Sequence, residues 1–292
     1  MLKFTLKSLT AVIAAGVLAV SLAGCQATSG TNATKSSTNV SGSKQQTATT
    51  GTLQKVVQSK KLTVGVILSF PPFGFKDEKG QPQGYDVDQA KAVAKSLGVE
   101  EKNLTIVDVT SDARIPSLET GKVDLVIGNF TRTLERAQKV DFTNPYIVAG
   151  ERMIVKKGSG IETIKDLGGK KLAVIKGSTN ADLVKEKTPT AEAVYFTTSA
   201  DAIAAIKNGQ ADAFMEDSNF LAFQAKQNPD LEVVGESDRA LEYNAFGVKK
   251  GDQDWLNYLN LFIFQTNNDG TNKELYKKWF GMDLPYELNP KY

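Results

Sequence analysis

Three short segments of the sequence place groups that bind opposite charges at the ends of expected strands. Arg136 follows the strand-to-loop segment GNFTRT, and KGSTN links an expected strand to an expected helix. The backbone N–H groups of Ser178 and Thr179, within KGSTN, should face an anion with the helix dipole behind them. Asp217 ends an apolar strand and opens a helix, at the sheet edge where open α/β folds bind ligands. The set predicts a site that holds one anionic and one cationic group.

Each of these residues also has a plainer interpretation. Arg136 could pair with Glu135 or Asp141 on a helix surface, and a Gly-Ser-Thr turn often does no more than cap a helix. Asp217 could serve only as an N-cap, although one carboxylate can fill both roles.

The composition excludes several kinds of chemistry. The chain has no histidine and only one cysteine, so it has no histidine catalysis, no ordinary zinc site and no internal disulfide. An enzyme built on this chain would have to use carboxylates, Lys176 or tyrosines as acid and base. We therefore expect no catalytic residue, no metal and no cofactor, and a ligand affinity that is almost flat between about pH 6 and 8.

The first 25 residues predict a lipoprotein leader. Lys3 and Lys7 precede an apolar run from Leu9 to Leu22, which is too short to span a bilayer comfortably. The run ends in LAGC, with small residues before the only cysteine, Cys25. We expect cleavage after residue 24 and lipidation of Cys25, which would anchor a secreted protein to the outer face of the cell membrane. The alternative for Cys25 is a buried or unpaired thiol.

The next segment is a tether, and the remainder is long enough for two lobes. Residues 25–51 are rich in Ser, Thr, Gly, Asn and Gln, so they cannot bury a core. Without the leader, Lys and Arg number 33 against 33 Asp and Glu, which gives no sign of nucleic-acid binding. The mature chain of 268 residues exceeds one typical domain.

Short apolar runs alternate with helical patterns, which indicates an α/β fold with mostly parallel sheets flanked by helices. The expected strands are 61–68, 104–109, 123–128, 171–175, 193–196 and 211–216. The expected helices are 86–98, 199–209, 217–227, 255–270 and 272–281.

Two further segments are expected to cross between the lobes as hinge strands, namely 147–157 and 242–250. The first lobe would then comprise 52–147 plus 245–292, and the second 148–244.

The sequence resembles the family 3 extracellular solute-binding proteins of polar amino-acid ABC transporters, which have the two-lobed type II periplasmic-binding fold. Taken in order, four stretches carry the resemblance over about Leu53 to Gly281: 65–98, 114–146, 164–180 and 211–222. The GYDVDQA segment within the first stretch marks the family and is expected to be structural, with Asp86 or Asp88 fixing the loop and the helix start.

The resemblance implies a role for each candidate residue. Arg136 would bind the α-carboxylate of an amino acid through a guanidinium fork, with Ser178 and Thr179 as further donors. Asp217 would bind the α-ammonium. Further ligand contacts are implied for a carbonyl, a hydroxyl and an aromatic ring, from Asn129, Thr131 and Phe70 respectively. Phe70 has core packing as its alternative.

Ligand identity depends on Arg114, at a family position that faces the ligand's side chain. An arginine there favours glutamate or aspartate, with glutamine or another neutral polar amino acid next. Relatives with arginine at this place also bind neutral polar amino acids, and Arg114 could instead pair with Asp112 or lie along the surface.

The resemblance implies a monomeric binding component that closes over one L-amino acid by hinge motion and works with a permease and an ATPase. The alternative from another class is an enzyme, because the same fold includes dehydratases of the cyclohexadienyl or arogenate type. A sensory or adhesive relative would share every residue named.

Overall fold

The computed structural model describes residues 51–188, 190–235 and 241–288. The expected leader, the lipidated Cys25 and the tether up to residue 50 lie outside these residues. The described part contains two five-stranded sheets and a small three-stranded one.

The first sheet is mixed. Its strand order is β5 (Leu104–Asp108), β1 (Leu62–Val66), β6 (Leu125–Val126), β13 (Glu242–Lys249) and β7 (Val140–Ala149). β1 pairs in parallel with β5 and β6, whereas β13 runs antiparallel to β6 and β7. The central parallel strands β1 and β6 are mostly buried, as expected for strands covered by helices on each side, whereas the edge strand β5 is partly exposed.

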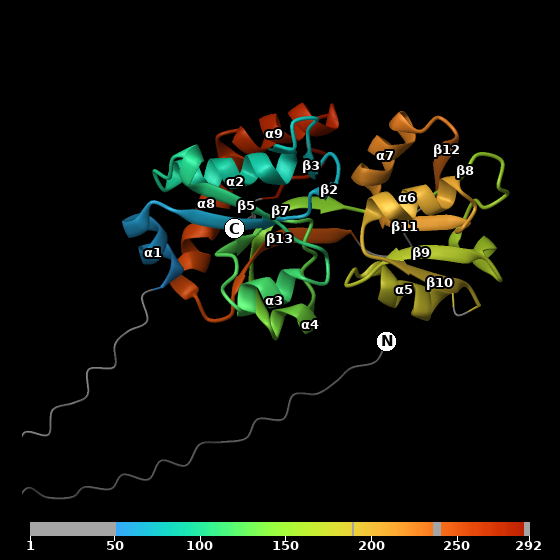
Figure 1. Cartoon of the computed structure of the whole chain (residues 1–292), viewed down its shortest axis with the longest axis horizontal. Helices are drawn as coiled ribbons and strands as arrows, with labels where there is room; N and C mark the ends of the chain where they lie inside the picture. Colours follow the sequence, from blue (N-terminus) through green and yellow to red (C-terminus); the bar gives the residue numbers. More distant parts are fainter. Residues whose placement is uncertain (1–50, 189, 236–240, 289–292) are drawn as a thin grey trace, which may run out of the picture. The chain divides into compact units, whose positions relative to one another are not determined.

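Helices cover both faces of the first sheet (Figure 1). On one face lie α2 (Tyr85–Ser96), α8 (Gln253–Asn268) and α9 (Thr271–Phe280), and on the other lie α3 (Arg114–Glu119) and α4 (Leu134–Ala137). Gly84 precedes α2 with φ +125°, and a Cβ there would collide with the carbonyl oxygen of Phe73. The backbone therefore requires glycine at the start of the GYDVDQA segment.

The second sheet is built in the same way. Its order is β10 (Glu192–Phe196), β9 (Lys171–Ile175), β11 (Ala213–Asp217), β8 (Glu151–Lys156) and β12 (Leu231–Val234). The first two pairings are parallel and the last two are antiparallel. On one face lies α5 (Asn180–Lys187), and on the other lie α6 (Ser199–Lys207) and α7 (Ser218–Gln227). The predicted two-lobed α/β fold is confirmed, with mixed sheets in place of mostly parallel ones.

The outgoing crossing segment is two strands and not one. β7 ends at Ala149 in the first sheet, Gly150 lies between, and β8 begins at Glu151 in the second. The return crossing is β13, which belongs to the first sheet. We infer that the lobes divide at Gly150 and between β12 and β13, close to the boundaries expected from the sequence.

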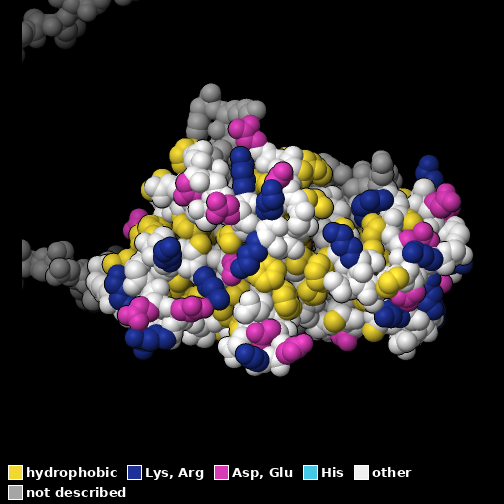
Figure 2. Space-filling model, turned by 90° about the horizontal axis from the view of Figure 1, so that it is seen from above, with side chains coloured by type: hydrophobic (Ala, Val, Ile, Leu, Met, Phe, Trp, Pro, Cys, Tyr) yellow, Lys and Arg dark blue, Asp and Glu magenta, His cyan; other side chains and the backbone are white. Residues whose placement is uncertain are grey.

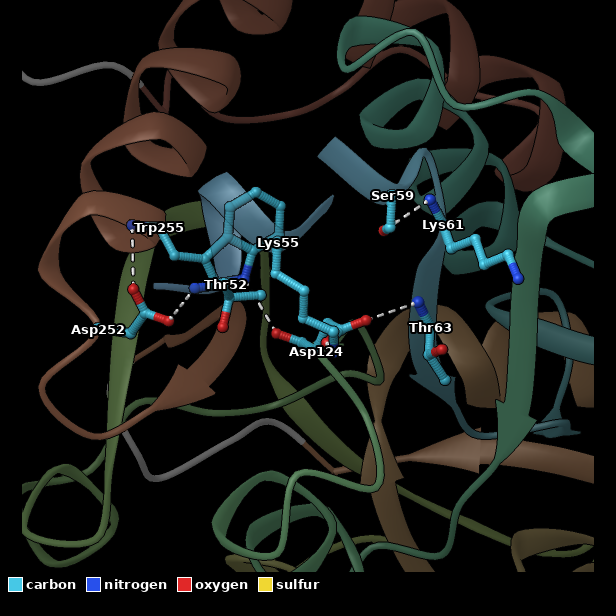
Figure 3. Close-up of polar contacts among 8 residues, drawn as sticks. All are labelled: Thr52, Lys55, Ser59, Lys61, Thr63, Asp124, Asp252 and Trp255. Atoms are coloured by element: carbon cyan, nitrogen blue, oxygen red, sulfur yellow. Dashed lines mark hydrogen bonds and ion pairs between the residues drawn. The ribbon is translucent and has the colours of Figure 1, made fainter. Parts of the chain in front are cut away.

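A helix absent from the sequence prediction, α1 (Thr52–Ser59), opens the described chain and packs against α8. Figure 3 shows how it is fastened: Asp252 accepts the backbone N–H of Thr52 at 3.0 Å and that of Trp255 at 3.4 Å. Lys55 forms an ion pair with Asp124 at 2.6 Å. These contacts attach the start of the fold to the first lobe.

The remaining elements are short. The small sheet consists of β2 (Ser69–Phe70), β3 (Gly74–Lys76) and β4 (Pro82–Gln83), and two 3₁₀ helices span Glu101–Asn103 and Ile164–Leu167. β12 and the small sheet were not predicted, because runs of two to four residues give no periodicity to detect.

The surface carries charges of both signs, interspersed over the face in Figure 2, as the balanced composition implies. Within the described ranges, no helix has the length and apolarity that crossing a membrane requires.

Candidate functional site

One cavity between the two sheets brings together all eight residues that the sequence and the resemblance proposed as ligand contacts. Its lining includes Phe70, Arg114, Asn129, Thr131 and Arg136 from the first lobe and Ser178, Thr179 and Asp217 from the second. The strands β9 and β11 end at this cavity, where side chains and backbone groups emerge from the sheet edge.

Arg136 lies in the short helix α4, which Thr133 caps by accepting the Arg136 backbone N–H at 3.1 Å. Its guanidinium donates to the carbonyl of Thr131 at 2.8 Å and, across the lobes, to the carbonyl of Gly177 at 2.9 Å. Asp141, an expected surface partner, instead accepts from Lys250 at 2.6 Å. These bonds hold Arg136 at the cavity, where its guanidinium faces the KGSTN loop of the second lobe.

The KGSTN loop differs in one detail from the expectation. The backbone N–H of Ser178 donates to the carbonyl of Ile175 at 3.1 Å, so it is not available to a ligand. The Ser178 hydroxyl, in contrast, is buried and has no hydrogen-bond partner among the described residues. The backbone N–H of Thr179 has no acceptor within that same part of the chain. The loop still presents two donors, one from a side chain and one from the backbone.

The two carboxylate oxygens of Asp217 can serve the two roles considered for it, one as a helix cap and the other as a ligand contact. Oδ1 caps α7, where it accepts the backbone N–H of Asn219 at 2.7 Å and of Phe220 at 3.3 Å. Oδ2 is buried and has no partner among residues 51–188, 190–235 and 241–288. Burial raises the pKa of Asp217 to about 7, and the nearby Glu242 adds to the rise. A cation beside Oδ2 would reverse that shift.

Arg114 is buried, so it does not lie along the surface, and its donors are largely used. Nε donates to the carbonyl of Ser111 at 2.9 Å, and Nη1 donates to those of Gly128 and Asn129, both at 3.0 Å. Nη2 donates to the carbonyl of Gly177 at 3.2 Å. Four of the five guanidinium N–H groups therefore have backbone acceptors. Burial, followed by the charge of Arg136, lowers the pKa of Arg114 to about 9.

Asn129 and Thr131 are fixed by their neighbours at the cavity wall. Asn129 has φ +43°, its carbonyl accepts from Arg114, and its side-chain oxygen accepts from Asn244. The Thr131 hydroxyl donates to Glu242 at 2.7 Å. The hydroxyl oxygen of Thr131 keeps its capacity to accept a hydrogen bond.

The GYDVDQA carboxylates do not fix the start of α2, whose N-cap is Gly84 without a side-chain cap. Asp86 instead supports the site, because it accepts the backbone N–H of Asn129 at 3.3 Å and the hydroxyl of Tyr146 at 2.7 Å. Burial raises the pKa of Asp86 to about 7. Asp88 fastens α2 to α9 by accepting from Lys278 and Trp279, at 2.6 and 2.8 Å.

Phe70 joins the lobes. Its ring stacks on that of Phe220 with centroids 4.3 Å apart and planes 3° from parallel, and it lies 5.1 Å from Phe73. Phe70 thus combines the two interpretations considered for it, since it packs in the core and borders the cavity.

Three glutamates that were not predicted from the sequence also line the cavity: Glu151, Glu216 and Glu242. Burial raises the pKa of Glu216 to about 8, and the charges of Asp217, Glu151 and Glu242 add to the rise. The only sequence signal was a pair of consecutive acids closing an apolar strand. The raised pKa values of Asp86, Asp217 and Glu216 favour an affinity that changes with pH, in contrast to the flat profile expected from the absence of histidine.

The family model of the bacterial extracellular solute-binding proteins, family 3, matches residues 62–282. The chain belongs to this family. Its fold is therefore the type II periplasmic-binding fold, it is a binding protein and not an enzyme, and its relatives act outside the cytoplasm.

Relatives and solved structures agree with this assignment. The glutamine-binding protein GlnH of an ABC transporter of Bacillus subtilis is 36% identical over 80% of this chain and 85% of its own. A glutamine-binding protein of Geobacillus stearothermophilus is 37% identical over 78% and 87%. The structure of an ancestral arginine-binding protein bound to glutamine matches with a TM-score of 0.72 and 39% identity, over 76% of this chain and 99% of that one.

Proposed function

We propose that the chain is the substrate-binding component of an ABC importer and binds one free polar L-α-amino acid between its lobes. The family supports solute binding, and the B. subtilis relative is part of an ABC transporter. The remaining support comes from the chemistry of the cavity.

The buried Oδ2 of Asp217, with no partner among the described residues, is the observation that carries the proposal. An ionised carboxylate left unpaired in a buried position is costly, and an α-ammonium would compensate it with a charge-assisted hydrogen bond. The Ser178 hydroxyl and the Arg136 guanidinium supply donors for an α-carboxylate. The site thus offers complementary charges to both ends of an amino-acid zwitterion.

The division of these groups between lobes supports capture by closure. Arg136 belongs to the first lobe, whereas Ser178 and Asp217 belong to the second. A ligand that bridges them stabilises the closed arrangement, and hinge movement at the crossing strands would give it a way in.

Arg114 bears on which side chain the bound amino acid carries. Arg114 was the reason to favour glutamate or aspartate, with glutamine next. Because four of its N–H groups already have backbone acceptors, Arg114 offers one remaining donor to a ligand oxygen. One donor suits the oxygen of an amide as well as that of a carboxylate. The glutamine-binding relatives support the amide.

The sequence of the leader supports attachment to the outer face of the membrane through a lipid on Cys25, with residues 25–51 as a tether. The partners would be a permease and an ATPase, and the protein would act as a monomer.

A thermal-shift screen tests the proposal. The twenty amino acids, a sugar and a dipeptide are each added to the purified full chain. A ligand that binds only the folded state stabilises it by about 4 kcal/mol at a thousandfold excess over Kd. A polar α-amino acid should give the largest rise in Tm. The proposal fails if the sugar or the dipeptide gives a larger rise, or if no amino acid gives one.

A further inference from the structure

The cavity carries more negative side chains than binding a zwitterion requires. Two arginines and four carboxylates line it. If the proposed function is right, Arg136 and Asp217 are matched by the two ends of the ligand. Arg114 then remains beside three glutamates, namely Glu151, Glu216 and Glu242. Among the described residues, no three such side chains converge as metal ligands would, so the surplus does not indicate a metal site.

Glu216 is the glutamate that directly precedes Asp217 at the cavity. Thr131 donates to Glu242 at 2.7 Å, and Thr179 donates to Glu151 at 3.5 Å. Glu216 Oε1 accepts the backbone N–H of Asp217 at 3.0 Å, and no residue of the described chain donates to Oε2. The residue is only 9% exposed, and it lines the cavity.

Glu216 belongs to the second lobe and lines the cavity together with residues of the first lobe. It stands next to Asp217 at the end of β11, so one strand brings two consecutive carboxylates to the cavity. Arg114 enters from α3, on the first lobe, with one N–H to spare. An amide group satisfies both, because its oxygen accepts from Arg114 and its NH₂ donates to Glu216. A carboxylate could only accept.

We propose that Glu216 contacts the side chain of the bound amino acid and selects side chains that donate N–H groups, an amide above all, over a carboxylate. This proposal rests on the proposed function and identifies the ligand class of the same cavity as glutamine-like. Three other carboxylates line the cavity with Glu216: Glu151 of β8, Asp217 of β11 and Glu242 of β13. The two cations that line it are Arg114 of α3 and Arg136 of α4.

If Glu216 selects the ligand in this way, binding is coupled to the release of a proton from Glu216. Burial and the neighbouring carboxylates raise the pKa of Glu216 to about 8. An amide N–H stabilises the ionised form, so amide binding releases the proton and strengthens as pH rises to about 8. A ligand carboxylate requires the proton to remain, because two carboxylates in contact do not both ionise, and its binding weakens above that pH. The ratio of the two affinities cancels the titration of Asp217, which both ligands share.

The test is calorimetric titration of glutamine and glutamate at about pH 6 and about pH 8.5. In the wild type, the ratio of glutamine to glutamate affinity should rise at least about tenfold between these pH values. In Glu216→Gln it should stay constant within about threefold, because no proton can be exchanged there. Glu192→Gln changes an exposed glutamate of the same lobe outside the cavity, and should keep the wild-type rise.

A constant ratio in the wild type would overturn the proposal, as would a rise that persists in Glu216→Gln. Absence of binding by either ligand, and by every other amino acid, would instead refute the proposed function. If Glu216→Gln does not fold, titrations of the wild type at about pH 7.5 in buffers of different ionisation enthalpy count the protons directly. Both ligands share the proton release from Asp217, so glutamine should release more protons than glutamate, and equal counts would overturn the proposal.

Discussion

Arg136 Nη2 donates a hydrogen bond to the backbone carbonyl of Gly177 at 2.9 Å. The bond joins α4 of the first lobe to the loop after β9 of the second. A carbonyl oxygen carries only a partial charge, so a ligand carboxylate is a stronger acceptor for the same guanidinium. We therefore expect a ligand to replace this neutral contact with a charge-assisted pair that holds the lobes together.

Truncating Arg136 to alanine should weaken amino-acid binding by about 2–5 kcal/mol, because the ligand carboxylate would stay buried without its cation. Arg136→Lys should also bind poorly, since an ammonium cannot reproduce the guanidinium fork. Calorimetric titration measures both. Arg132→Ala, at an exposed arginine of the same segment outside the cavity, is the control. Wild-type affinity in both Arg136 variants would remove this residue from the site.

Asp217→Asn should separate capping from binding. The amide oxygen can still accept the N–H groups of Asn219 and Phe220, so α7 should stay capped and Tm should change little. Affinity should fall at least about tenfold, because the ligand ammonium loses its charged partner. Asp182→Asn, at an exposed position of the same lobe, should bind normally. Equal affinity in Asp217→Asn and the wild type would leave Asp217 with the capping role alone.

The candidate site residues come from motifs near strand ends, and they line one cavity. Thr179 follows β9 and Asp217 ends β11 at one edge of the second sheet, Arg136 follows β6 of the first sheet, and all three line the cavity between the sheets. Most long strands and helices were predicted within a few residues. In the outgoing crossing only Gly150 separates β7 from β8, too short a break for the sequence to show that the chain changes sheet there.

Contacts between distant residues could not be predicted. Nothing in the GYDVDQA segment indicates that Asp86 accepts from Asn129, 43 positions away. The engagement of Arg114 by four carbonyls depends on how loops from both lobes meet. The raised pKa values of the cavity carboxylates arise mainly from burial, which the sequence does not reveal.

Affinity should depend on pH through Asp217. Its pKa is about 7 without a cation nearby, and a ligand ammonium lowers it, so binding releases a proton. The contribution of Asp217 to the affinity for any amino acid should therefore fall as pH decreases below about 7, by up to tenfold per unit, and level off above. Titrations of the preferred ligand from about pH 5.5 to 7.5 measure this. A flat profile would mean that Asp217 is ionised throughout.

Stability without ligand should show the opposite slope through Asp86. Its pKa is 3.8 in an unfolded chain and about 7 when folded. The protonated form contributes stability that is fully present below pH 3.8 and is lost as pH rises through 7. Tm should therefore decrease from about pH 5 to 8, and the decrease should be smaller in Asp86→Asn. The exposed Asp230→Asn should keep the wild-type slope. An unchanged slope in Asp86→Asn would show that Asp86 is ionised in the folded protein.

The most direct test of amino-acid binding modifies the ligand. The amino acid that gives the largest thermal shift is titrated calorimetrically beside its N-acetyl and α-carboxamide derivatives. If Asp217 binds the ammonium and Arg136 the carboxylate, each blocked derivative should bind at least about a hundredfold more weakly, because one buried charge is left unpaired. A derivative that binds as tightly as the free amino acid would contradict the account.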